Sequence, residues 1–158
     1  MIAGWADEAW LLPDDARGWR AFDGAGDGPV ALLPYRDPFV SARRGPRILT
    51  ERVDAPVLDR GKKPSRLGDV NGLHHHVIVC GGEMVGVWEY DPKARAVVTR
   101  VWNTDRKLRP RIAEAADATG RFIRGELGDA KLSAVDPPAA RARRLAFCRA
   151  TDRRRGRL

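Results

Sequence analysis

The stretch His74-His75-His76-Val77-Ile78-Val79-Cys80-Gly81-Gly82-Glu83-Met84-Val85-Gly86-Val87-Trp88 decides the fold of this chain, because it has the pattern of a β-hairpin. Two runs of β-branched residues flank a Gly-Gly pair, which suits a two-residue turn with positive φ at both positions. Turning the chain at this pair predicts a register in which Val79 lies opposite Met84. The same register places His75 opposite Trp88.

Both faces of this predicted hairpin are apolar, because β-branched side chains occupy successive positions at 77–79. A strand that is apolar on both faces is buried on both sides or belongs to a small closed sheet. Gly86 interrupts the second strand, where a glycine indicates a bend or a close backbone approach. The β-branched run at 96–102 predicts a third antiparallel strand. We therefore predict a small antiparallel β-barrel, or a strongly curved sheet, over residues 30–104.

A strand and a helix flank this predicted sheet. Val30-Ala31-Leu32-Leu33 is typical of a buried strand, and Pro34 ends it. Residues 105–128 carry one apolar stripe at helical spacing, with Gly128 well placed to end the helix. The predicted fold class is α+β, with this C-terminal helix packed on the sheet. We expect residues 1–138 to form a single globular domain.

The net charge of +8 is concentrated at one end of the 158-residue chain. Residues 139–158 hold eight arginines against one acid, Asp152, a net charge of +7 that leaves +1 for the rest. Few large apolar residues accompany these arginines, so the segment has little to bury. We therefore predict that residues 139–158 form a basic mobile tail.

The cysteines and the N-terminus bear on the compartment. Cys80 and Cys148 share no motif, which favours a reduced protein. Residues 1–8 lack the basic and apolar regions of a signal peptide. No run reaches the ~20 apolar residues that span a bilayer. We expect a cytoplasmic protein with no membrane partner.

The residue types that carry chemistry do not form a recognisable active site. His74, His76 and Cys80 share one strand face, but the ~13 Å from position 76 to position 80 is too long for one zinc ion. No serine lies in a Gly-x-Ser-x-Gly elbow, and a thiol beside a turn is more often inert than nucleophilic. Asp37 is typical of an Asx turn. We predict no metal, no cofactor and no catalytic residue, with zinc binding and a Cys80 nucleophile as less favoured alternatives.

Three motifs together resemble a known family. Leu32-Leu33-Pro34-Tyr35-Arg36-Asp37-Pro38-Phe39 has the form Leu-Leu-Pro-x-x-Asp-x-aromatic, and an arginine-containing stretch follows at 43–47. The predicted hairpin with its Gly-x-Trp strand comes next, and then an amphipathic helix with the aromatic-apolar pair Phe122-Ile123. In order and spacing over residues 5–128, the chain resembles the C-terminal part of the AlkZ/YcaQ-like superfamily of winged-helix DNA glycosylases.

This resemblance implies both a fold and a limit on activity. It implies that residues 1–30 are the strand-helix remnant of a winged helix, and that a small β-barrel and its packing helix lie beside a DNA channel. The family excises bases with a Gln-x-Gln motif in the part that would precede this chain. This sequence contains no glutamine. We therefore expect the chain not to be an enzyme on its own.

Two functions from different classes follow from these observations. The first is a non-catalytic module that binds double-stranded DNA, with basic residues as its contacts. These contacts are Lys62, Lys63, Arg66, His74, Arg141, Arg143, Arg144, Arg153, Arg154 and Arg155. The alternative is a structural or protein-interaction domain that completes a separately encoded catalytic half. In that case Trp5, Trp10 and Trp19 form an apolar N-terminal surface for a protein partner or for self-association.

Overall fold

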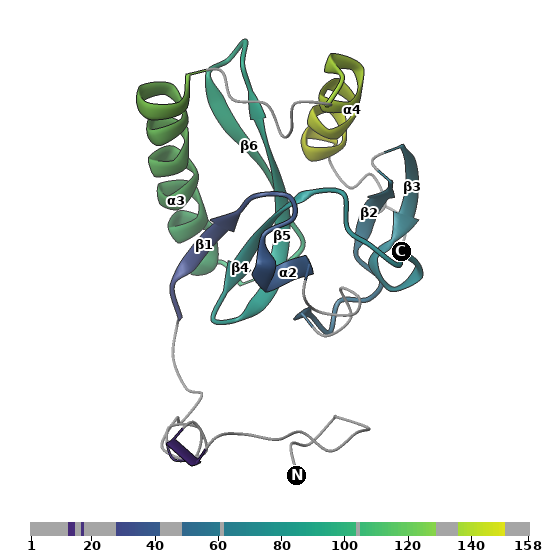
Figure 1. The fold of residues 1–158 in the computed structure, drawn as a ribbon, viewed down its shortest axis with the longest axis vertical. Helices are drawn as coiled ribbons and strands as arrows, with labels where there is room; N and C mark the ends of the chain where they lie inside the picture. The colour runs from purple at the N-terminus through teal and green to yellow at the C-terminus, as the bar shows by residue number, and fades with distance from the viewer. Residues whose placement is uncertain are drawn as a thin grey trace.

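The structure is a computed structural model that describes residues 13, 14, 17, 28–41, 49–60, 62–103, 105–128 and 136–150. Its strands are β1 (Val30–Leu33), β2 (Pro56–Asp59), β3 (Lys63–Arg66), β4 (His76–Cys80), β5 (Glu83–Asp91) and β6 (Ala96–Val101). Its helical segments are α2 (Pro38–Ser41), η2 (Leu67–Asp69), α3 (Leu108–Phe122), the π-helical turn η3 (Ile123–Leu127) and α4 (Pro138–Arg149). An antiparallel sheet in the order β1-β4-β5-β6 forms the centre, and β2 pairs with β3 in a separate two-stranded ribbon (Figure 1).

The predicted hairpin is confirmed as β4 and β5, with a change of register. Gly81 and Gly82 form the turn with φ of 57° and 86°, and Val79 lies opposite Met84 as expected. A β-bulge then inserts one extra residue into β5, so that residue 88 lies opposite His76 and not opposite residue 75. The prediction of a His75–Trp88 pair is therefore wrong by one residue, because a bulge places two residues of one strand against one of the other.

Gly86 lies beside this bulge and is confirmed as a point of close backbone approach. A Cβ atom at this position would lie 2.6 Å from the carbonyl oxygen of Arg100 and 3.1 Å from the Cα atom of Val101. Both of these residues belong to β6, where Val101 is the register partner of Gly86. Only a glycine allows the two strands to come this close.

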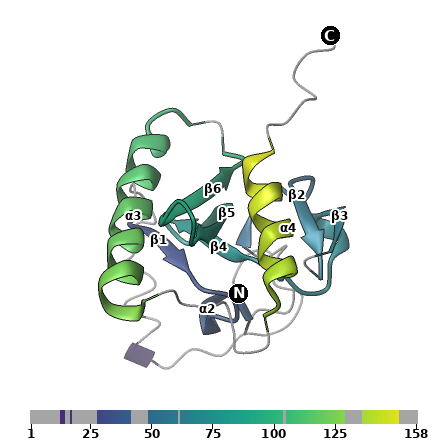
Figure 2. The same ribbon diagram turned by 90° about the horizontal axis from the view of Figure 1, so that it is seen from above.

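Helix α3 covers one face of the sheet. Its buried residues Leu108 and Ile112 pack with Ile78, Val85 and Trp88 of the hairpin. Figure 2 shows α3 on one side of the sheet and α4 with the β2–β3 ribbon on the other. The expected helix over 105–128 is thus confirmed as α3 and η3, and it ends at Gly128 with φ of 63°.

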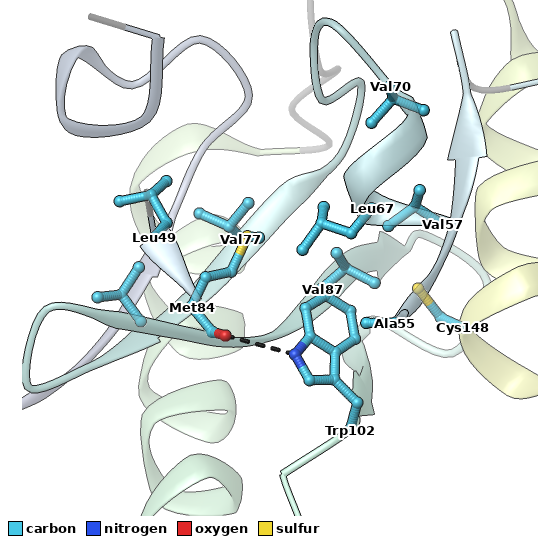
Figure 3. Close-up of a cluster of buried hydrophobic side chains, with 11 residues drawn as sticks. Leu49, Ala55, Val57, Leu67, Val70, Val77, Met84, Val87, Trp102 and Cys148 are labelled. Carbon is cyan, nitrogen blue, oxygen red and sulfur yellow. Dashed lines mark hydrogen bonds between the residues drawn. The ribbon is translucent and has the colours of Figure 1, made fainter. Parts of the chain in front are cut away.

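A second apolar cluster lies between the opposite face of the sheet and the β2–β3 ribbon with α4. Met84 and Val87 from the sheet meet Val57 and Leu67 from the ribbon side, and all four are fully buried. Trp102 closes the edge of this cluster and donates its indole N–H to the carbonyl oxygen of Met84 at 3.3 Å (Figure 3). Burial of the hairpin on both faces, as the sequence predicted, is therefore confirmed.

The predicted β-barrel or strongly curved sheet is wrong. Within the described residues the sheet is open, with β1 at one edge and β6 at the other. Closure is one way to bury both faces of a sheet, and covering each face with another layer is the second. This chain uses the second way, since α3 covers one face while α4 and the ribbon cover the other. The fold class is therefore α+β with open antiparallel sheets.

The basic segment after residue 138 also differs from the prediction of a mobile tail. Residues 138–149 form α4, which buries Leu145 and Cys148 against the sheet. Residues 151–158 lie outside the described part of the chain, as does most of the expected winged-helix remnant over 1–30. Among the described residues, no helix combines the length and the apolar character needed to cross a membrane.

Candidate nucleic-acid interface

The β2–β3 ribbon and its turn carry three of the basic side chains predicted to contact nucleic acid. Lys62 lies in the turn, and Lys63 and Arg66 are at the two ends of β3. All three are exposed, and none forms a salt bridge with any described residue. They therefore present positive charge to solvent along one edge of the molecule.

Buried contacts fix this ribbon to the rest of the protein. Val57 and Leu67 have no exposed surface and belong to the apolar cluster under the sheet. The backbone N–H of Leu58 donates to Nε2 of His75 at 3.0 Å, which ties β2 to the start of β4. Asp59 and Leu73 form an isolated antiparallel bridge beside this contact. The ribbon is thus a positioned support for its basic side chains.

Helix α4 separates its arginines into two environments. Residues 144, 145 and 148 are buried, whereas Arg143 points outward and is exposed. Arg141 is half-buried, and Arg149 pairs with the carboxylate of Asp91. Arg153, Arg154 and Arg155 lie outside the described residues. On this helix Arg143 is therefore the arginine best placed to meet a ligand.

Arg144, one of the predicted nucleic-acid contacts, lies in the interior and pairs with acids of this chain. Its Nε donates to Oε2 of Glu89 at 2.5 Å, and its Nη2 donates to Oδ2 of Asp136 at 2.6 Å. Only 3% of the residue is exposed. Burial acts to lower the pKa of this guanidinium, but the bonds to Asp136 and the charge of Glu89 raise it above its ordinary value. Arg144 is an internal counterion that fixes α4 on the sheet.

Glu89 occupies the other end of this ion pair. It is 1% exposed, and burial raises the pKa of its carboxyl against the opposing effect of Arg144. Nε2 of His76 lies 3.7 Å from Oε1 of Glu89. A buried carboxylate needs charged and hydrogen-bonding partners, and here the guanidinium supplies both.

His75 and His76 are buried in the neutral state. Burial, with a further contribution from the charge of Arg144, lowers the pKa of each to about 3. Nδ1 of His76 accepts the backbone N–H of Tyr35 at 2.9 Å, and its ring stacks on Trp88 with centroids 4.2 Å apart. Nδ1 of His75 has no hydrogen-bond partner among the described residues. These two rings are structural and do not face a ligand.

His74, the third histidine of the run, is the one that remains accessible. It is half-buried, and its Nδ1 lies 3.1 Å from the hydroxyl oxygen of Tyr35. Burial lowers the pKa of His74, and the charges of Arg36 and Arg60 lower it further while Asp59 opposes them. Sequence reasoning did not select Arg36 or Arg60, because the segments that bring them to His74 are distant along the chain.

The geometry also bears on the alternatives of a metal site and a cysteine nucleophile. The described residues contain no group of three histidine, cysteine or acidic side chains arranged to hold a metal ion. Burial raises the pKa of Cys148 to about 12, so this thiol is a poor nucleophile. The thiol of Cys80 contacts the carbonyl oxygen of Gly28 at 3.5 Å. Asp37 forms the expected Asx turn, accepting the N–H of Phe39 at 2.9 Å.

Comparison of the chain with protein-family models, with curated proteins and with solved structures finds no match. Function is therefore inferred from the residues and contacts described above.

Proposed function

We propose that this chain is a non-catalytic module that binds double-stranded DNA through the β2–β3 ribbon and the exposed side of α4. The observation that carries the proposal is the set of exposed cations at positions 62, 63 and 66, which have no salt-bridge partner among the described residues. Elsewhere on this side of the molecule, Arg144 and Arg149 are neutralised by acids. Unpaired basic side chains on a rigid support are the usual source of phosphate contacts.

The ribbon and α4 form a continuous region suited to this role. Both views of the molecule place them side by side, on the face of the sheet opposite α3 (Figures 1 and 2). Phe147 of α4 lies near His75, with ring centroids 5.3 Å apart, and His75 accepts a hydrogen bond from β2. Arg143 adds an exposed positive charge on this helix.

The salt dependence of binding tests this proposal. Each neutralised phosphate contributes about −0.9 to the slope of log K against log salt concentration, so three ribbon contacts contribute about −2.7. Changing Lys62, Lys63 and Arg66 together to glutamine should remove most of this contribution. The measurement is fluorescence anisotropy with a labelled duplex over a series of salt concentrations.

A charge-matched variant on the other face serves as the control. Lys107, Arg109 and Arg121 are exposed residues at the start of α3 or within it. Their combined change to glutamine removes the same charge and should leave the slope nearly unchanged. If both triple variants alter the slope equally, binding reflects net charge alone and the ribbon is not the interface.

We further propose kinship with the C-terminal part of the AlkZ/YcaQ-like glycosylases. The segment Leu32–Phe39 and the Gly86-Val87-Trp88 strand support it, whereas the open sheet does not fit the barrel that the resemblance implies. The lack of glutamine argues against base excision by this chain. Under single-turnover conditions, the purified protein should release no alkylated purine from duplex DNA above the rate without enzyme.

A protein-interaction role is the second candidate. Phe122 is 55% exposed and Leu127 is 54% exposed, and both lie near the end of the α3–η3 segment. Large apolar side chains exposed close together favour contact with a protein partner. The three N-terminal tryptophans first considered for this role, at positions 5, 10 and 19, lie outside the described residues. If the unaltered protein does not bind duplex DNA even at low salt, this second role is favoured.

A further inference from the structure

Three segments that are distant in sequence meet at His74. The turn after β1 brings Tyr35, whose hydroxyl oxygen lies 3.1 Å from Nδ1 of His74 and whose ring centroid lies 5.4 Å from that of the imidazole. The bridge between Asp59 and Leu73 brings the end of β2 to the residue before His74. His74 therefore lies beside the β1–α2 turn and next to the end of β2.

Each of these two turns carries an arginine in an unusual backbone conformation. Arg36 has φ of 67° and Arg60 has φ of 46°, values in the left-handed region that bulky side chains seldom adopt. Both side chains are exposed. The guanidinium carbon of Arg36 lies 5.3 Å from the centre of the Tyr35 ring. Strained backbone of this kind is retained most often where it positions a functional group.

Both arginines follow residues that meet His74 or its neighbour: Arg36 follows Tyr35, and Arg60 follows Asp59, which pairs with Leu73. Burial is the main cause that lowers the pKa of the imidazole; the charge of Asp59 raises it, and the charges of Arg36, Arg60 and, to a smaller extent, Arg144 lower it further. At neutral pH the ring is therefore uncharged. If the Tyr35 hydroxyl donates to Nδ1, the proton of the ring is on Nε2, which can then donate to a ligand.

We propose that Arg36, Arg60 and His74 form a binding site for one phosphate group. A guanidinium group can bind phosphate through charge-assisted, bidentate hydrogen bonds, and the imidazole would supply one further donor. The proposal rests on the proposed function, because a DNA strand passing along the ribbon would provide the phosphate. Free phosphate has the same chemistry, so the experiment must separate these two sources.

The first arm uses inorganic phosphate and the full chain. Phosphate replaces chloride at constant ionic strength, and NMR follows the ring signals of His74. The variants are Arg36→Asn and Arg60→Asn, because asparagine tolerates positive φ better than most residues and carries no charge. Arg95→Asn is the matched control, since Arg95 has φ of 52° and lies in the turn between β5 and β6.

Wild-type protein and Arg95→Asn should show the same saturable shift of the His74 signals. Arg36→Asn and Arg60→Asn should each weaken phosphate binding about tenfold or more, the loss of one charge-assisted contact. A wild-type titration that does not saturate overturns the site. The proposed site is also wrong if Arg36→Asn, Arg60→Asn and Arg95→Asn all bind phosphate with equal affinity.

The second arm uses the labelled duplex and the double variant Arg36→Asn/Arg60→Asn. If both arginines hold one phosphate of the strand, the salt slope should decrease in magnitude by about 0.9, whereas two separate phosphates would give about 1.8. A decrease near 1.8 overturns a shared phosphate. If the salt slope is unchanged but the NMR titration shows saturable phosphate binding that depends on Arg36 and Arg60, the site binds free phosphate and not DNA. If the wild-type protein and every variant fail to bind DNA, the proposed function is wrong, while the first arm still decides the phosphate site.

Discussion

Arg144 of α4 and Glu89 of β5 form an ion pair in the interior, with Nε 2.5 Å from Oε2 and no more than 3% of either residue exposed. The same guanidinium bonds Asp136, just before the helix. The pair joins a helix to the middle of the sheet across 55 positions of sequence. The position of α4 therefore depends on charge as well as on apolar burial.

Removing one member of this pair should be strongly destabilising. Arg144→Met leaves Glu89 and the side chain of Asp136 without their counterion, and the expected loss is about 3–5 kcal/mol in the free energy of unfolding. The measurement is urea denaturation at neutral pH. Arg143→Met is the control on the same helix, because residue 143 is exposed, and it should change stability by less than about 0.5 kcal/mol.

A second variant distinguishes charge from packing. Arg144→Met combined with Glu89→Met removes both charges of the pair, and should recover part of the loss because apolar replacements of a buried pair are often tolerated. If the double variant is no more stable than Arg144→Met alone, the loss comes from packing, and our account of the ion pair is wrong.

Stability should decrease as the pH falls below about 6.5. His75 and His76 have a folded-state pKa of about 3, whereas an unfolded histidine titrates near 6.5. The unfolded chain therefore binds more protons between these values, and each ring reduces stability by roughly 1.4 kcal/mol per pH unit in that window. Between about pH 7.5 and pH 5 the expected loss is about 3–4 kcal/mol. Urea denaturation at several pH values measures it.

Glu89 and the other histidines provide the checks on this prediction. The raised pKa of Glu89 has the opposite sign: stability is gained as the pH falls from its folded-state pKa to the unfolded value of 4.5, which offsets part of the loss. His75→Gln should remove about half of the loss in this pH window. His74→Gln should remove less, because that ring is only half-buried. Equal effects of the two variants would contradict the burial of His75.

Trp88 should be essential for stability. It is 5% exposed, and its indole N–H donates to the carbonyl oxygens of Leu33 and Val77, each 3.1 Å from Nε1. Trp88→Ala should cost about 3–5 kcal/mol, as other large aromatic truncations do. Trp88→Phe keeps a ring but loses the donor, and should cost about 1–3 kcal/mol. A loss below about 1 kcal/mol for Trp88→Ala in urea would show that this side of the hairpin is not core.

Gly86 offers a test of strand spacing. The Cβ of Gly86→Ala would meet the carbonyl oxygen of Arg100 at 2.6 Å, so one strand must shift, and we expect a cost of at least about 1–3 kcal/mol. Gly125→Ala is the matched control. No atom lies within 4 Å of the Cβ it would add, and alanine favours the helix by up to about 1 kcal/mol. Thermal or urea unfolding should therefore move in opposite directions for the two variants.

Local patterns in the sequence predicted local structure well. The Gly81-Gly82 turn, the strand at 96–101 and the helix ending at Gly128 all depend on residues that are neighbours in the chain, and all are confirmed. Gly86 was also predicted as a close approach. The bulge beside it was not predicted. A register derived from the position of the turn assumes that residues pair one to one, so it cannot show where one strand has an extra residue.

The errors concern contacts between distant segments. The segment after residue 138 was expected to bury little, because few large apolar residues accompany its arginines. In the structure the buried side of α4 consists of Leu145, Cys148 and an arginine, Arg144. That arginine is buried with two carboxylate partners, Asp136 just before the helix and Glu89 far earlier in the chain. The proposed phosphate site at His74 was not predicted for the same reason, since Tyr35 and Asp59 come close to His74 and Leu73 only in the folded chain.

The separation between Glu89 and Arg144 has a consequence for synthesis on the ribosome. When β5 is made, its central carboxylate must remain hydrated, because the arginine that neutralises it is translated 55 positions later. The hairpin can form as soon as both of its strands are made. The face of the sheet that α4 covers remains exposed to water until α4 has been synthesised. Slow translation before α4 would therefore lengthen the time for which that face is exposed.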